Sequence, residues 1–188
     1  MPREQLHYGP TAKVFHWVIV ALLAVQLPLG WLMPDIHRGM QPGDAMVLHI
    51  SIGMTVLVLI VLRFLWRLTH PVAPETNLPG WQRLSSELVH WLLYLVVLST
   101  TLTGWMFASI RGWTIRLFWA VPLPHLVAEG SPVGRAIGPW HDTLPWILVG
   151  LIAVHVLAAL VHLFVYRDRV MQRMLPNSFR PAPARGNA

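Results

Sequence analysis

The chain has 188 residues, of which 55% are hydrophobic and only 12% are charged, with a formal net charge of +6. Soluble domains carry roughly 25% charged residues, so this composition excludes an ordinary soluble domain and predicts an integral membrane protein. The absence of cysteine excludes disulfides, thiolate-bound iron–sulfur clusters and thioether-attached haem. The basic balance indicates membrane topology and contact with the lipid bilayer rather than nucleic-acid binding.

Four long apolar stretches predict membrane-spanning helices over 12–34, 44–66, 85–110 and 139–166. Each is longer than the roughly 20 residues that a helix needs to cross the hydrocarbon core of a bilayer. Ser85 and Ser86 are candidate caps for the start of the third helix. The expected fold is therefore an all-α bundle of four transmembrane helices in a single domain, 1–179, followed by a disordered cytoplasmic tail, 180–188.

The distribution of basic residues predicts the orientation of these helices. The N-terminus, the second loop and the C-terminal segment carry ten Lys and Arg residues, and the two loops on the opposite side carry four. By the positive-inside rule, both termini are expected in the cytoplasm. The third loop, 111–139, is the longest connection, and its segment TIRLFWAVPLPHL is expected to be a short amphipathic segment on the outer surface or an irregular apolar loop.

Four of the six histidines inside the predicted spans fall into two pairs by depth. His141 and His155 are on the fourth span, on nearly the same face and about 21 Å apart along the helix axis. His49 lies near the outer end of the second span, and His16 lies near the cytoplasmic end of the first. Depth therefore pairs His49 with His141 on the outer side and His16 with His155 on the inner side.

Paired imidazoles on facing helices suit a bis-histidine haem of b type, because both axial positions are filled and the iron is left for electron transfer. A zinc site would need three or four ligands converging at one depth, and a proton relay through the histidines is a less economical alternative. His90 on the third span and His162 on the fourth could each replace His155 as the partner of His16. The spacing leaves this choice open.

His162 is also a candidate for a quinone site. It lies roughly 10 Å nearer than His155 to the cytoplasmic end of the fourth helix, and a histidine can supply both a hydrogen bond and a proton to a quinone. Leu160, Leu163 and Phe164 offer an apolar wall for the ring. The alternatives are a histidine at the membrane interface or a hydrogen bond to a haem propionate.

Short motifs around these histidines resemble the bacterial cytochrome b561 family. They are the His16-Trp17 pair, LHISIG with His49, WHDTL with His141, GLIAVH with His155, and the Arg111-Gly112 pair. The resemblance implies two b haems in a four-helix bundle, one held by His16 and His155 and the other by His49 and His141. It also implies an oxidoreductase of the bacterial inner membrane that moves electrons between a periplasmic donor and the ubiquinone pool.

One activity described in this family oxidises superoxide outside the membrane and reduces ubiquinone near the cytoplasmic side. Arg111, Arg116 and Arg135 of the third loop would attract such an anion, although ordinary surface arginines are equally consistent with the sequence. Two other functions stay open. The chain could be a cytochrome b anchor for a separate dehydrogenase or hydrogenase partner, or a haem-free, histidine-lined transporter of metal ions or protons.

Overall fold

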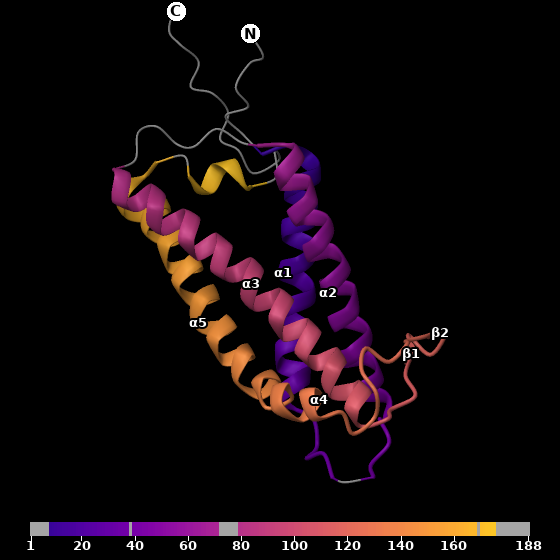
Figure 1. The fold of residues 1–188 in the computed structure, drawn as a ribbon. Helices are drawn as coiled ribbons and strands as arrows, with labels where there is room; N and C mark the ends of the chain where they lie inside the picture. The colour runs from indigo at the N-terminus through magenta and orange to yellow at the C-terminus, as the bar shows by residue number, and fades with distance from the viewer. Residues whose placement is uncertain (1–7, 38, 72–78, 169, 176–188) are drawn as a thin grey trace, which may run out of the picture.

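The computed structural model describes residues 8–37, 39–71, 79–168 and 170–175. Four long helices form a bundle, with a small hairpin and a short helix inserted before the last of them (Figure 1). All four spans are long and apolar enough to cross a membrane, which confirms the expected all-α architecture. The tail predicted over 180–188 lies outside the described residues. The long helices are α1 (Pro10–Trp31), α2 (Asp44–Thr69), α3 (Gly80–Ile110) and α5 (Trp140–Val161).

The helices alternate in direction, so the bundle has two ends (Figure 1). We call the end that holds the start of α1 and the last turn of α5 the terminal end, and the opposite end the distal end. At the terminal end a 3₁₀ turn, η2 (Met171–Arg173), follows α5. Lys13 on α1 donates from Nζ to the carbonyl of Leu175 at 2.8 Å, so the segment after α5 is tied back to the first helix.

The third helix starts at Gly80 rather than at the expected residue 85. The carbonyl of Pro79 accepts the first helical hydrogen bond, from the N–H of Gln82 at 3.0 Å. Ser85 lies inside the helix, where its hydroxyl donates to the carbonyl of Trp81 at 2.8 Å instead of capping the helix start. The expected start was wrong because a serine in a helix can bond to its own preceding turn as readily as it caps.

A buried apolar layer fills the middle of the bundle. At its centre are Val56 on α2, with no exposed surface, and Leu148 on α5, 2% exposed. In sequence, Leu148 lies midway between the two histidines of α5, and Val56 lies two turns beyond His49. This layer therefore separates the distal half of the bundle interior from the terminal half. Its other members are Ile19, Ile52, Ile60, Val96 and Val97.

The third loop folds back as a hairpin, in place of the amphipathic segment or irregular apolar loop that the sequence suggested. Its strands are β1 (Arg116–Leu117) and β2 (Val121–Pro122), which pair in antiparallel register. The chain then forms a short helix, α4 (Pro132–Ile137), before α5. Figure 1 shows the hairpin beside α2 at the distal end, away from α5.

Two aromatic residues make the turn of this hairpin in the left-handed region, with φ of 47° at Phe118 and 61° at Trp119. Such conformations cost about 1–3 kcal/mol each for bulky residues, so other contacts must hold them. The N–H of Phe118 donates to Oγ of Ser51 at 2.8 Å. The indole N–H of Trp119 donates to the carboxylate of Asp44 at 3.0 Å. Helix α2 therefore fixes the hairpin.

Candidate functional site

The distal histidine pair is formed by His49 on α2 and His141 on α5. Their ring centroids lie 6.3 Å apart, and the ring planes are inclined by 79°. Both side chains are partly buried in the bundle. The structure therefore brings together the two histidines that their depth in the sequence had paired.

The terminal histidine pair has nearly the same geometry. The ring centroids of His16 on α1 and His155 on α5 also lie 6.3 Å apart, with an angle of 72° between the planes. Helix α5 thus contributes one histidine to each pair, while α1 and α2 contribute one each. The two pairs lie on opposite sides of the buried apolar layer.

The centroid distance has the value that a shared metal ion would require. A metal lies about 2.0–2.1 Å from a coordinating imidazole nitrogen. Adding the roughly 1.2 Å from that nitrogen to the ring centre, on both sides, gives a separation of about 6.4 Å. Among the residues that the structure describes, no group of three or more His, Cys, Asp or Glu side chains is placed to hold a metal ion. The imidazoles therefore occur in pairs, as an axial site needs, rather than in the larger sets typical of zinc.

The distal pair faces a cavity of about 570 Å³ between the helices. This volume is within the range of roughly 300–1,000 Å³ that small-molecule and cofactor sites occupy. Two glycines of its wall lie directly against the histidines. A Cβ atom at Gly104 would come within 2.6 Å of Cε1 of His141, and one at Gly30 within 3.0 Å of Cε1 of His49. The absence of side chains at both positions lets each imidazole ring lie directly against the backbone of the neighbouring helix.

Hydrogen bonds determine which nitrogen of His141 is free. Its Nδ1 lies 3.0 Å from the carbonyl of Thr100 on α3, so Nδ1 carries the proton and donates it. Nε2 is then the nitrogen with a lone pair for a metal. The ring of Phe107 stacks on His141, with centroids 6.5 Å apart and planes inclined by 26°. His141 is therefore held in both tautomer and orientation.

His49 is held differently. The side-chain amide of Gln26 on α1 donates to the carbonyl of His49 at 3.0 Å, and its nitrogen lies 3.2 Å from Nε2 of the His49 ring. Nδ1 of His49 and Oε1 of Gln26 are buried without a hydrogen-bond partner among the described residues. Buried polar atoms are rarely left unpaired. The unpaired atoms thus mark the wall of the cavity as a place where a bound group belongs.

Two further residues accompany the terminal pair. The ring of His90 on α3 lies 5.2 Å from that of His155, and its Nδ1 donates to the carbonyl of Ser86 at 2.6 Å. That centroid distance is about 1 Å shorter than a shared metal would need. Arg63 of α2 donates to the hydroxyl of Tyr94 at 3.0 Å and to a carbonyl of α1 at 3.1 Å. A guanidinium inside a membrane helix indicates a functional site.

His162 lies apart from both pairs. It begins a π-helical turn, η1 (His162–Tyr166), that follows α5 directly. Its Nδ1 pairs with the carboxylate of Asp168 at 2.5 Å, and its ring lies 5.3 Å from that of Tyr166. The sequence left His90 and His162 as alternatives to His155 as the partner of His16. His90 contacts the ring of His155, whereas His162 is paired with Asp168.

The three arginines of the third loop lie in different places. Arg111 lines the distal cavity, and its guanidinium lies 4.5 Å from the ring centre of Phe107 and 5.6 Å from that of Trp113. Arg116 is exposed on the hairpin, where it donates to the carbonyl of Ala120 at 2.8 Å. Arg135 is exposed on α4. The structure therefore brings only Arg111 to the cavity.

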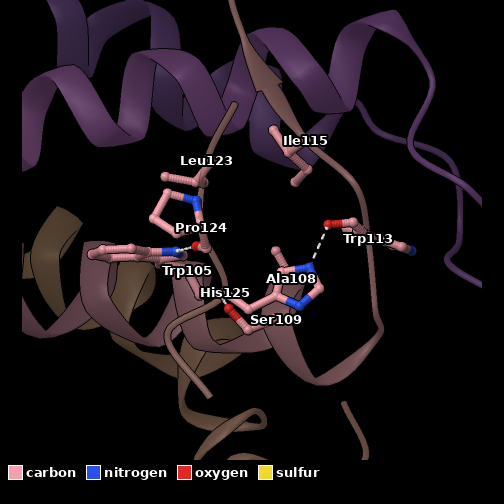
Figure 2. Close-up of a pocket in the computed structure, with 8 residues that line it drawn as sticks. All are labelled: Trp105, Ala108, Ser109, Trp113, Ile115, Leu123, Pro124 and His125. Atoms are coloured by element: carbon pink, nitrogen blue, oxygen red, sulfur yellow. Dashed lines mark hydrogen bonds between the residues drawn. The ribbon is translucent and has the colours of Figure 1, made fainter. Parts of the chain in front are cut away.

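The third loop also forms a shallow hollow against the end of α3 (Figure 2). Trp105 donates from its indole to the carbonyl of Pro124 at 2.8 Å, and Nε2 of His125 lies 3.2 Å from the carbonyl of Trp113. The hydroxyl of Ser109 accepts the N–H of Leu126 at 2.9 Å. The hollow has no space for a water molecule, so these residues fix the loop on α3 and offer no ligand site.

Several residues of this arrangement were not among the predicted site residues. Gly30 and Gly104 are two among 13 glycines, and Thr100 is one of several hydroxyl residues on α3. Gln26 was the most detectable, because it is the only amide side chain in the first predicted span. A polar side chain in an apolar membrane helix is a functional candidate by the same reasoning that selected the histidines.

Comparison with known proteins places the chain in a family. The sequence model of the prokaryotic cytochrome b561 family matches residues 7–177. Cytochrome b561 homolog 2 of Escherichia coli is 29% identical over 175 residues, which cover 91% of this chain and 92% of the relative. The probable superoxide oxidase CybB of Yersinia pestis is 27% identical, over 86% of this chain and 91% of the relative. Cytochrome b562 of Cereibacter sphaeroides is 27% identical, over 85% and 89%. With a match over nearly its whole length, the chain belongs to the prokaryotic cytochrome b561 family, a family of multi-pass bacterial membrane proteins that implies b-type haem.

Proposed function

We propose that this chain is a di-haem cytochrome b that takes electrons from a donor at the distal end and delivers them to ubiquinone at the terminal end. The observation that carries the proposal is the pair of histidine couples with the same 6.3 Å centroid spacing, one near each end of the bundle. When bound, b haem supplies reversible one-electron transfer. Two such sites in series offer a path across the apolar middle of a membrane protein.

The residues divide between the two sites. His49 and His141 would hold the distal haem, with Gly30 and Gly104 leaving room for the two imidazole rings. His16 and His155 would hold the terminal haem. Arg63 would place a positive charge near that haem, where it can balance a propionate.

The distal donor is superoxide in this proposal. The relative from Yersinia pestis carries the name probable superoxide oxidase, which supports this choice. Arg111 offers a positive charge at the wall of the distal cavity, where it favours an anion. Two superoxide anions would release two electrons and leave as two molecules of dioxygen.

The acceptor is ubiquinone, and His162 is the residue that would face it. Reduction to ubiquinol takes the two electrons and two protons, and the imidazole is suited to hand on a proton at neutral pH. The excess of basic residues at the terminal end supports placing this end in the cytoplasm. The protons would then come from the cytoplasmic side, and dioxygen would be released in the periplasm.

The experiment uses the purified full chain. A pyridine-haemochrome assay should give two b haems per polypeptide, and one haem or none would contradict the proposal. Anaerobic addition of superoxide should reduce both haems, and ubiquinone should then reoxidise them. A chain without haem would favour the histidine-lined transporter. Haems that only a copurifying dehydrogenase or hydrogenase can reduce would favour the anchor subunit.

A further inference from the structure

The contact between His162 and Asp168 has no place in the haem sites. The side chains are 14% and 26% exposed, and Nδ1 of His162 lies 2.5 Å from Oδ2 of Asp168. The second carboxylate oxygen of Asp168 accepts the N–H of Val170 at 3.0 Å. Both oxygens of this carboxylate are therefore engaged, and its orientation toward the imidazole is fixed.

The local backbone creates this contact. After α5 the chain forms the π-helical turn, and Arg167 then adopts a left-handed conformation with φ of 52°. The N–H of Asp168 donates to the carbonyl of His162 at 3.2 Å, which closes the turn. A left-handed arginine and a π turn are both uncommon, and such features are frequent at functional sites. Their effect here is to carry Asp168 back to the ring of His162.

We infer that Asp168 is a positioning residue that holds His162 in the tautomer and orientation needed to pass a proton to ubiquinone. This inference rests on the proposed quinone role of His162. A carboxylate that accepts the Nδ1 proton leaves Nε2 as the nitrogen that can face a quinone oxygen. His162 donates from its imidazolium form, in which both ring nitrogens carry a proton. As electrons reach ubiquinone, the Nε2–H bond breaks, an O–H bond forms on the quinone, and His162 is left neutral with its proton on Nδ1. A proton from the aqueous phase at the terminal end then restores Nε2–H, and a second transfer supplies the second proton of ubiquinol. Asp168 stays ionised throughout.

The surroundings of the turn suit a lipid-soluble substrate. Phe164 and Val165, on the same π-helical turn, are 67% and 69% exposed. In a membrane these apolar side chains face acyl chains, which is the phase from which a quinone with an isoprenoid tail arrives. His162 therefore lies where the apolar and aqueous phases meet, which a reaction that consumes protons requires.

The test measures the reoxidation of the reduced, haem-loaded chain by ubiquinone-1. The protein is reduced anaerobically, freed of reductant and mixed with excess ubiquinone-1 in a stopped-flow spectrometer. The observed first-order rate constant does not depend on the fraction of chain that folds. The variants are Asp168→Asn, Asp168→Glu, His162→Gln and the double variant Asp168→Asn/His162→Gln. Glu87→Gln is the matched control, because it removes an exposed carboxylate near the same end of the bundle.

Asp168→Asn and His162→Gln should each slow reoxidation by about tenfold or more, as expected for a lost proton transfer. The double variant should be no slower than His162→Gln, because Asp168 acts through the imidazole. Asp168→Glu should recover most of the rate, and Glu87→Gln should keep all of it.

Each failure has its own signature. If His162→Gln keeps the normal rate, the quinone role of His162 fails, and the present inference fails with it. If His162→Gln is slow while Asp168→Asn is normal, only the role of Asp168 is refuted. If the two effects multiply in the double variant, Asp168 supports the turn rather than the imidazole, and the inference is again refuted.

Discussion

Replacing Gly104 with alanine should remove the distal haem and spare the terminal one. The new methyl group would lie 2.6 Å from Cε1 of His141 and 3.1 Å from its Nδ1. Carbon atoms pack at about 3.5–4.0 Å, so the ring must move by roughly 1 Å. Metal–ligand distances tolerate only about 0.2 Å. The ring cannot yield cheaply, because Thr100 and Phe107 hold it on two sides.

The assay is the haem content of the purified chain, measured by pyridine haemochrome together with the visible spectrum of the reduced protein. Gly104→Ala should lower the content from two haems per chain to about one. The remaining terminal haem shows that the bundle has folded. Gly150→Ala is the matched control, because a Cβ there meets nothing within 4 Å and alanine favours the helix. Two haems with an unchanged spectrum in Gly104→Ala would refute the assigned site.

Three further predictions concern the same sites. His49→Ala or His141→Ala should each remove the distal haem alone, and loss of both haems from either variant would show that the sites are not independent. The ring planes in both pairs are inclined by more than 70°. Because crossed imidazole ligands leave two iron d orbitals nearly equal in energy, the oxidised protein should give low-spin EPR signals with an unusually large highest g value. Two ordinary rhombic signals would contradict this geometry. Arg111→Gln should slow haem reduction by an anionic donor more than Arg135→Gln does, with a difference that shrinks as salt rises; equal rates at low ionic strength would assign no steering role to Arg111.

The arrangement of the histidines could be predicted because it depends only on helix length and helix period. His141 and His155 lie on one helix, so their depth and face follow from the rise and twist per residue. The antiparallel order of four spans then places His49 and His16 at matching depths. No side-chain detail is needed for this step.

The walls of the sites depend on which helix faces meet, and the sequence carries little information about that. Gly30 and Gly104 matter only because α1 and α3 turn these positions toward His49 and His141. The contact of His162 with Asp168 depends on a π turn, which no residue pattern indicated. The hairpin turn was missed because Phe118 and Trp119 occupy left-handed positions that normally carry glycine or asparagine.

The position of α5 in the chain has a consequence for biosynthesis. Each histidine pair takes one member from α5, which is the last of the four long helices to leave the ribosome. While α1, α2 and α3 are already in the membrane, neither pair exists. Insertion of this one helix completes both histidine pairs, so the two pairs form together. A chain interrupted before residue 140 would contain neither pair.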